Sequence, residues 1–408
     1  MTPKQRMLNA YRGLPSDRLP VAPELWYYYP AKLLGVDMIE FERAVPFHQA
    51  LKKAFEHYGC EGWGVAFAGA PNNRVSGESS ERWVDADTLE VRHITHTPHG
   101  DLTSAQRYHR EEPSWSVERP IKDLKRDLPA WELAALGGVP EAMDVSGLIR
   151  AWNEVGESYL LEAWLGVPFF DYLATAMQGG LEEGICTFLE PEMEPKLLEL
   201  QARYTDYMVR LARTICEKTP LESLCLGCSW SCNSLIGPDL WRRWDKPVIR
   251  AVAEEIHRHG KLLHIHFHGK CLETVADFPE IGADCVCPFE RPPGGDIVGL
   301  EGLKAVERLL AGRTTMNGNV HTVETLIRGT PADVRREVRE IREAFRGNPR
   351  VIIGTGDQVG RETPEENLIA MIEETLRDGR TSRPKVSPSV ALLANLQRQR
   401  SAEEENWI

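Results

Sequence analysis

The sequence has little that suits a membrane, a secretory route or a nucleic acid. No uninterrupted apolar run approaches the roughly 18 residues that a membrane span needs, and the first segment, MTPKQRMLNAYRGLPSDRLP, lacks the apolar core of a signal peptide. Its 48 Lys and Arg are outnumbered by 61 Asp and Glu and form no local cluster, so the formal charge of −13 repels a phosphate backbone. We expect a cytoplasmic protein that binds neither membranes nor nucleic acid.

Cysteine is too sparse and too scattered for a small scaffold held by disulfides. The nine cysteines of this 408-residue chain are an odd number, and two close pairs, Cys225/Cys228 and Cys285/Cys287, fall in predicted strands. Cys225, Cys228 and Cys232 lack the second C-x-x-C or the nearby histidine of a structural zinc site. We expect reduced thiols, with Cys285 and Cys287 as buried apolar side chains rather than ligands.

The hydrophobic pattern of the C-terminal half alternates between strand-like and helix-like segments. Strands are predicted at 221–230, 261–269, 283–290, 313–320 and 350–357, and each is followed by a helical segment. Strands and helices in this order build a parallel sheet, and the lack of a Gly-x-Gly-x-x-Gly turn after the first strand disfavours a dinucleotide-binding fold. Together with an equally α/β N-terminal half, this pattern predicts a closed (β/α)8 TIM barrel.

One stretch of the N-terminal half departs from this pattern. From Arg82 to Tyr108 polar and apolar residues alternate in short runs separated by turn-forming residues, which predicts a small antiparallel β insertion. The hydrophobic content of 42% is enough for a sizeable core. We expect one barrel domain at 1–385, including the insertion at about 82–108, and a C-terminal surface helix and tail at 386–408.

Histidine is concentrated on one predicted strand. Successive side chains of a strand alternate between its faces, so His264, His266 and His268 in KLLHIHFHG point the same way, in a chain with only 12 histidines. Barrel active sites lie at the C-terminal ends of the strands, which selects His266 and His268. The ends of the following strands add further polar groups, namely Glu290, Asn319, His321 and Asp357.

This predicted rim could hold a metal. Two imidazoles and one carboxylate form a ligand set for Zn²⁺ or another divalent ion, with positions left open for a substrate, but the spacing supports a packed histidine pair equally well. The first strand ends near Glu24, and the aromatic residues after it either line a pocket for a planar ligand or pack the barrel mouth. We assign acid/base roles to Glu290 and His321, and either an acid/base role or a supporting role to Glu24. We assign substrate contacts to Trp26, Tyr27 and Asn319.

Several short segments together resemble one family. They are TPKQRMLNAYRGLPSDRLPVAPE, HFHGK, GADCVCPFE followed by GD, TMNGNVHTVETLIRGTPADV and TPEENLIAMIEE. In these segments the chain is similar to the uroporphyrinogen decarboxylase superfamily, most strongly from about residue 235 to 375. That superfamily includes the corrinoid-dependent methyltransferases of the methylcobalamin:coenzyme M type, and the resemblance implies a (β/α)8 barrel.

The resemblance is closer to the methyltransferase branch than to the true decarboxylases. The decarboxylases are expected to bind porphyrinogen carboxylates through an arginine-rich N-terminal element, whereas this chain reads APELWYYYPAKLLG there. The methyltransferases carry a zinc motif, His-x-Cys-Gly, and a later cysteine, and the resemblance places these three ligands at His266, His268 and Asp357. Harder ligands thus replace both thiolates, and a His₂Asp zinc is suited to polarising an oxygen atom.

The resemblance therefore implies a metal-dependent methyltransferase with zinc as its metal. We expect it to move a methyl group between a small oxygen-bearing donor, such as an aromatic methyl ether in O-demethylation, and the corrinoid of a partner protein. The alternatives are a decarboxylase of a small organic acid or a porphyrinogen-like substrate, with rim groups as acid and base, and a non-catalytic ligand-binding barrel. Whether the chain forms a homodimer is left open.

Overall fold

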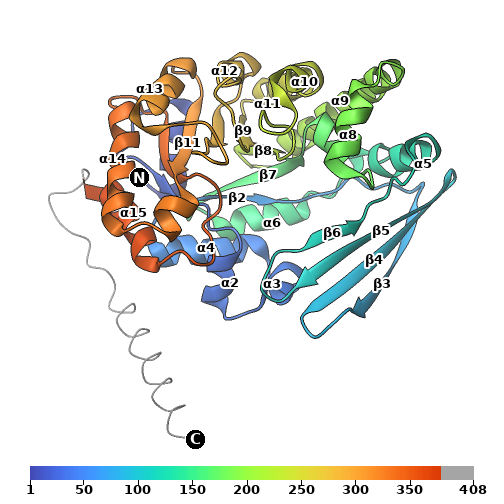
Figure 1. Ribbon diagram of the computed structural model, residues 1–408, viewed down its shortest axis with the longest axis horizontal. Coiled ribbons are helices and arrows are strands. Elements are labelled where there is room, and N and C mark those ends of the chain that lie inside the picture. The colour runs from blue at the N-terminus through green and yellow to red at the C-terminus, as the bar shows by residue number, and fades with distance from the viewer. Residues whose placement is uncertain (378–408) are drawn as a thin grey trace, which may run out of the picture.

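Eight parallel strands form one curled sheet in the computed structural model, which describes residues 1–377. The strand order is β1-β12-β11-β10-β9-β8-β7-β2, and helices cover the outside of the sheet (Figure 1). The strands are β1 (Val21–Ala22), β2 (Trp63–Ala66), β7 (Leu160–Gly166), β8 (Ser223–Cys228), β9 (Leu262–Phe267), β10 (Cys285–Pro288), β11 (Thr315–Val320) and β12 (Val351–Thr355). The tail predicted at 386–408 lies outside the described residues.

The predicted alternation of strands and helices is confirmed in the C-terminal half. The helices from β8 onward are α10 (Gly237–Trp244), α11 (Lys246–Arg258), α12 (Asp277–Ile281), α13 (Gly299–Leu309), η2 (Thr322–Ile327), α14 (Pro331–Ala344) and α15 (Glu365–Leu376). Those before β8 are α1 (Pro3–Arg12), α2 (Tyr28–Leu34), α3 (Met38–Ala44), α4 (Phe47–Tyr58), α5 (Leu124–Leu136), η1 (Pro140–Ala142), α6 (Ser146–Val155), α7 (Phe169–Ala174), α8 (Gly180–Leu189) and α9 (Glu194–Lys218). None of the described helices is both long and apolar enough to cross a membrane.

The sheet does not close into a barrel. β1 and β2 are its two ends, and no ladder of hydrogen bonds joins them within residues 1–377. The prediction of a closed barrel is therefore wrong, although the curled sheet is barrel-like. β1 is only two residues long because Pro20 and Pro23 flank it, and proline has no amide hydrogen to donate to a neighbouring strand.

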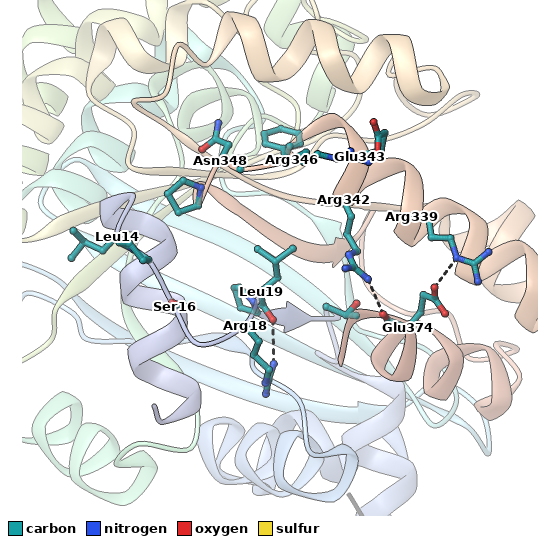
Figure 2. Close-up of a pocket in the computed structure, with 16 residues that line it drawn as sticks. Leu14, Ser16, Arg18, Leu19, Arg339, Arg342, Glu343, Arg346, Asn348 and Glu374 are labelled. Carbon is teal, nitrogen blue, oxygen red and sulfur yellow. Dashed lines mark hydrogen bonds and ion pairs between the residues drawn. The ribbon is translucent and has the colours of Figure 1, made fainter. Parts of the chain in front are cut away.

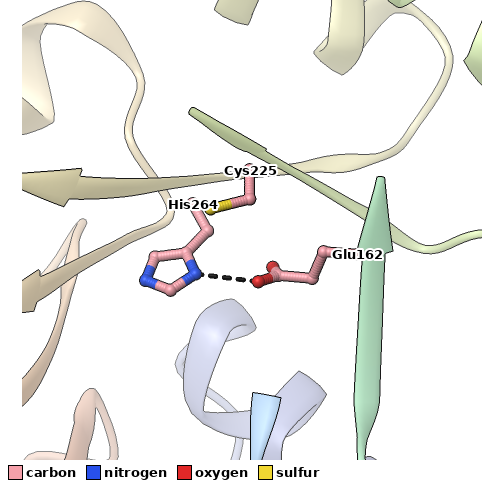
Figure 3. A group of neighbouring side chains, drawn as sticks. All are labelled: Glu162, Cys225 and His264. Atoms are coloured by element: carbon pink, nitrogen blue, oxygen red, sulfur yellow. Dashed lines mark hydrogen bonds and ion pairs between the residues drawn. The ribbon is translucent and has the colours of Figure 1, made fainter. Parts of the chain in front are cut away.

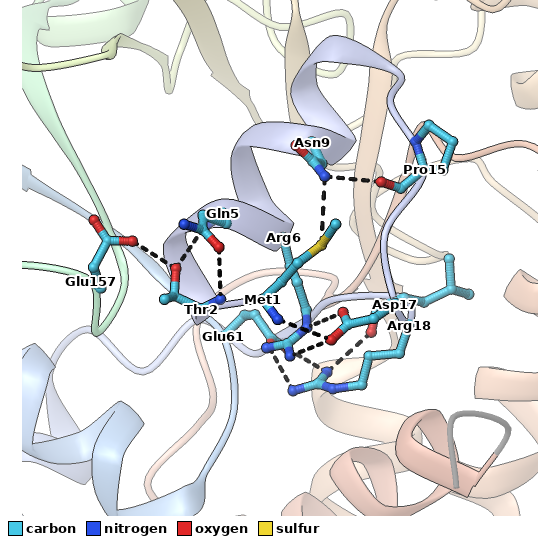
Figure 4. Close-up of polar contacts among 11 residues, drawn as sticks. Met1, Thr2, Gln5, Arg6, Asn9, Pro15, Asp17, Arg18, Glu61 and Glu157 are labelled. Atoms are coloured by element: carbon cyan, nitrogen blue, oxygen red, sulfur yellow. Dashed lines mark hydrogen bonds and ion pairs between the residues drawn. The ribbon is translucent and has the colours of Figure 1, made fainter.

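A side chain bridges the gap that the sheet leaves between β1 and β2. The buried carboxylate of Glu61, two residues before β2, accepts a hydrogen bond of 2.9 Å from the backbone N–H of Val21. Arg18 and Arg6 hold the same carboxylate through contacts of 2.6 and 3.0 Å (Figure 4). An ion-paired carboxylate thus takes the place of part of the missing ladder.

Helix α1 closes the N-terminal end of the sheet. It begins with a capping box, in which Thr2 and Gln5 each accept a hydrogen bond from the other's backbone N–H (Figure 4). Its last turn reaches into the sheet, where the Tyr11 hydroxyl lies 3.1 Å from Nδ1 of His264 and the Ala10 carbonyl accepts a 2.7 Å hydrogen bond from Thr315. The opposite end of the sheet, where the strands end, is the end that carries the site.

The predicted antiparallel sheet is confirmed, and it is wider than the sequence pattern indicates. Its strands, in order, are β3 (Ser76–Trp83), β4 (Thr88–Thr97), β5 (Gly100–His109) and β6 (Trp115–Glu118), and they extend from one side of the molecule (Figure 1). β3 begins before Arg82, but every residue in it is exposed, so it shows no apolar alternation. The segment after Trp83 is a turn in which Asp85 accepts hydrogen bonds from the N–H groups of Asp87 and Thr88.

Candidate active site

The histidines of β9 face the interior of the curled sheet. The Trp63 ring, on β2, contacts the rings of both His264 and His266 at centroid distances of 4.5 and 5.7 Å. β2 and β9 are not neighbours in the sheet, so these rings meet across its interior. His264 is fully buried and lies deepest, and His268 follows the last residue of β9 at the open end.

The five polar groups nearest this open end form one cluster. Nε2 of His266 lies 2.7 Å from Nε2 of His268, and Nδ1 of His268 lies 3.0 Å from Oε1 of Glu290. Asp357 places a carboxylate oxygen 4.0 Å from His268, and Glu24 places one 4.0 Å from Nδ1 of His266. One ligand atom from each of His266, His268 and Asp357 lies within 4.8 Å of the other two.

The electrostatics of this cluster indicate which of its groups are protonated and which present a lone pair. Burial and the nearby charge of Asp357 raise the pKa of Glu24 well above its usual range, so Glu24 holds a proton. Burial opposes protonation of His268, but the hydrogen bond to Glu290 and the charge of Asp357 outweigh it and raise the pKa of His268 to about 9. Burial and the charge of His268 lower the pKa of His266 well below its usual value.

The short contact between the two histidines decides what can lie between them. Two imidazole nitrogens 2.7 Å apart cannot both present lone pairs to each other, so a proton or a metal ion must lie in that direction. In the metal-free protein the proton of His268 fills this role. The separation of 2.7 Å is that of a hydrogen bond, so the two rings would have to move apart to bind one divalent ion; together with Asp357 they form a donor set that suits a metal.

A second group of potential ligands lies deeper in the sheet. Glu162 on β7, Cys225 on β8 and His264 are all fully buried, and one ligand atom of each lies within 4.8 Å of the others (Figure 3). Nδ1 of His264 lies 2.8 Å from Oε2 of Glu162, and the Ser223 hydroxyl donates to the other oxygen of Glu162 at 2.6 Å. Sequence reasoning missed Glu162, although a single carboxylate in the apolar run YLLEAWLGV is a signal that could have found it.

Cys287 lies between the two groups. Its sulfur is 3.1 Å from Nε2 of His264 and 2.9 Å from Nδ1 of His266. Cys285 and Cys287 are both buried, as the sequence predicts, but Cys287 also makes polar contacts that the alternation of strand residues does not indicate. In the register between β10 and β9, Cys287 lies beside His266, which explains the contact.

A model of the uroporphyrinogen decarboxylase (URO-D) family matches residues 117–377, well over half of the chain. The chain belongs to the URO-D family. This confirms the superfamily that the sequence segments indicate, and the histidine cluster lies inside the matched region of this URO-D chain.

Solved structures support the fold of this URO-D chain. A methyltransferase from Methanosarcina mazei superposes with a TM-score of 0.63 at 16% identity, over 93% of this chain and 100% of the other. An uncharacterised protein matches at 16% identity over 45% of this chain and 47% of its own, with a TM-score of 0.26. No curated protein matches the sequence. At such low identity the methyltransferase shows a shared fold.

Two of the predicted site residues have other roles in the structure. Nε2 of His321 lies 2.8 Å from the Pro292 carbonyl, and its Nδ1 accepts hydrogen bonds from the two N–H groups that open η2. Both ring nitrogens are therefore engaged with backbone, and His321 does not join the cluster. Asn319 donates to the Phe289 carbonyl at 2.9 Å, and its Oδ1 is buried without a partner in the described part of the chain.

The aromatic residues after β1 divide between the site and the core. The Trp26 ring lies nearly parallel to that of His266, with centroids 6.2 Å apart, and contacts Trp63. Its Nε1 is buried and has no partner among residues 1–377. Tyr27 instead packs against Phe41 of α3 and Phe47 of α4. Trp26 is thus beside the cluster, whereas the contacts of Tyr27 are with neighbouring helices.

A hollow of about 890 Å³ lies away from this cluster (Figure 2). Its lining includes Leu14, which follows α1, and Asn348, which precedes β12, so it lies towards the N-terminal ends of the strands. Arg339 in its wall is paired with Glu374 at 2.7 Å. The hollow is therefore separate from the histidine cluster.

Proposed function

We propose that this protein is a metal-dependent methyltransferase that holds Zn²⁺ through His266, His268 and Asp357. It transfers a methyl group from a small oxygen-bearing donor to the corrinoid of a separate protein, and the donor that we favour is an aromatic methyl ether. The observation that carries the proposal is the facing pair of Nε2 atoms, 2.7 Å apart, with the Asp357 carboxylate in reach. Two imidazoles and one carboxylate hold zinc and leave a position open for substrate.

The surroundings of His266, His268 and Asp357 favour this group as the metal site over the deeper group of Glu162, Cys225 and His264. Glu290 contacts Nδ1 of His268 and Cys287 contacts Nδ1 of His266, so each ring has its second nitrogen engaged, as metal-binding histidines do. His268 and Asp357 are partly exposed, which leaves a path for an ion and a substrate. In the inner group Nδ1 of His264 already contacts Glu162, and all three side chains are fully buried.

The chain's own residues supply the remaining chemistry. A bound zinc ion polarises the ether oxygen. Trp26 offers a flat ring beside His266 for an aromatic donor. When the methyl–oxygen bond breaks, its electron pair would stay on the oxygen, and Glu24 would donate its proton to that oxygen. The reduced corrinoid of the partner would supply the electron pair that accepts the methyl group. Glu24 then regains a proton from solvent.

The decarboxylase alternative rests on the name of the family. The carboxyl groups of the site argue against a substrate that itself has many carboxylates. Within the described residues, Glu24, Glu290 and Asp357 form no ion pair with Lys or Arg, and the cluster contains no guanidinium to bind carboxylates. The shared fold of the Methanosarcina mazei methyltransferase is the observation from the comparisons that favours methyl transfer.

Metal analysis and one assay test this proposal. We expect about one zinc ion per purified chain, lost in His266→Ala, His268→Ala and Asp357→Ala and kept in His96→Ala, which changes a partly exposed histidine of the antiparallel sheet. The wild-type protein should convert cob(I)alamin to its methylated form with methoxyarenes as donors. Unchanged zinc content in His268→Ala would overturn the metal site, and release of carbon dioxide from an acid without methyl transfer would favour the lyase.

A further inference from the structure

An unbroken line of polar contacts runs from the buried interior of the sheet to its open end. Successive contacts measure 2.8, 3.1, 2.9, 2.7 and 3.0 Å. The groups in order are Glu162, His264, Cys287, His266, His268 and Glu290. Three strands, β7, β9 and β10, contribute to it, and the inner part is closed to solvent.

The direction of the hydrogen bonds in this line follows from its inner end. We take Oε2 of Glu162, the nearer oxygen at 2.8 Å, as the acceptor for Nδ1 of His264, with the Tyr11 hydroxyl oxygen 3.1 Å from the same nitrogen; His264 then presents a lone pair at Nε2. The Cys287 thiol donates to that lone pair, and its sulfur accepts the Nδ1 hydrogen of His266. The Nε2 atom of His266 is then left with a lone pair that faces His268. Reversal of the line would put a hydrogen on this atom instead.

We propose that Glu162, His264 and Cys287 are positioning residues that set the tautomer of His266, so that its Nε2 lone pair faces the metal. The proposal rests on the proposed metal site at His266, His268 and Asp357. The inner group of Figure 3 is then a support for the metal ligand rather than a second metal site. A neutral imidazole binds a metal only through its unprotonated nitrogen, so the line decides which nitrogen is available.

Cys287 is the residue on which this arrangement depends most. Within residues 1–377 its sulfur is the only side-chain atom in hydrogen-bond contact with both rings, and Cys287 lies opposite His266 in the register of β10 and β9. Cys285 lies on the same strand and opposite His264, but within the described part of the chain no hydrogen bond joins it to His266. Cys225 lies beside His264 on the other neighbouring strand and is not part of the line. These two cysteines are therefore matched controls.

The test compares metal affinity and ring tautomer in the full chain. Zn²⁺ and Co²⁺ affinities are measured by chelator competition for wild type, Cys287→Ala, Cys287→Ser, Cys225→Ala and Cys285→Ala. We expect a loss of roughly 10- to 100-fold in Cys287→Ala. Cys287→Ser, whose hydroxyl also donates and accepts, should recover most of it, and both controls should bind as wild type. In ¹⁵N spectra of histidine-labelled protein, wild-type His266 should be the Nδ1–H tautomer. In Cys287→Ala, His266 should be a mixture of the Nδ1–H and Nε2–H tautomers.

The outcomes separate this inference from the function on which it rests. If His268→Ala and Asp357→Ala lose the metal but Cys287→Ala binds it as tightly as wild type, the positioning role is overturned and the metal site stands. If Cys225→Ala loses the metal and His268→Ala keeps it, the inner group is the metal site and both proposals fail. If Cys287→Ala does not fold, Cys287→Val fills a similar volume without a donor or acceptor and replaces it in the comparison.

Discussion

Glu290 should control both the affinity of the metal site and the stability of the rim. Its Oε1 atom is 3.0 Å from Nδ1 of His268 and accepts the backbone N–H of Gly269 at 2.9 Å. The informative changes are Glu290→Gln, which keeps an accepting oxygen but removes the charge, and Glu290→Ala, which removes both. Glu324→Gln is the matched control, because Glu324 is exposed in η2 and, among residues 1–377, its side chain pairs only with Arg328.

The size of each effect follows from these two contacts. A carboxylate that orients a metal-binding imidazole is worth roughly 10- to 100-fold in affinity, or about 1.4 to 2.7 kcal/mol, so Glu290→Gln should weaken zinc binding by this amount. Glu290→Ala also leaves two poorly solvated N–H donors without a partner. At roughly 1 to 3 kcal/mol for each donor, we expect it to lower the free energy of unfolding by roughly 2 to 6 kcal/mol, more than Glu290→Gln does.

The assay must separate the metal from the proton that it replaces. Glu290 helps to raise the pKa of His268 to about 9, and below that pH a proton on His268 competes with the metal. A change at Glu290 therefore weakens the binding of this proton as well as the binding of zinc. Zinc affinity is therefore measured above pH 9 by chelator competition, and stability by urea unfolding of the metal-free protein. Zinc binding by Glu290→Gln that equals wild type at this pH, while His268→Ala loses the metal, would refute the orienting role.

Three further changes test other parts of the structure. Burial raises the pKa of Asp245 to about 8, so the folded protein keeps a proton there that the unfolded chain releases above about pH 4. The free energy of unfolding should therefore fall by roughly 1 to 1.5 kcal/mol per pH unit between pH 4 and pH 8. Urea unfolding across this range should show a shallower fall for Asp245→Asn than for wild type. Glu61→Ala leaves Arg6 and Arg18 without their shared carboxylate, so thermal and urea unfolding should show a loss of about 3 to 5 kcal/mol, and a loss below 1 kcal/mol would contradict the bridge between β1 and β2. His321→Ala should lower stability by about 1 kcal/mol, because the ring caps η2, and should leave zinc affinity unchanged; a large loss of zinc would restore His321 to the site.

Local patterns in the sequence were sufficient for much of the architecture. The alternation of apolar strands and amphipathic helices predicts the parallel sheet because each segment needs one particular face buried, and neighbouring residues decide this. The spacing of His264, His266 and His268 likewise places them on one face, since side chains alternate along any strand. β3 escaped this logic because none of its residues is buried, so no periodicity marks it.

Contacts between distant segments are what the sequence could not supply. Pro20 and Pro23 limit β1, but the bridge to β2 depends on the carboxylate of Glu61, which lies 40 residues from Val21 along the chain. The role of Glu290 beside His268 depends on the two strands lying next to each other. These relations are set by strand order and register, which no local pattern encodes.

The sequence by itself determined which polar residues stand at the ends of the strands and on which faces of the strands they lie, because hydrophobic period and residue type are local properties. Only the tertiary structure decided which of them meet. It brought Glu24, His266, His268, Glu290 and Asp357 to one rim, turned His321 toward backbone, and placed Cys287 between two imidazoles. The physical reason is that hydrogen bonds and ligand sets depend on distances of a few ångströms between strands, and the packing of the whole sheet sets those distances.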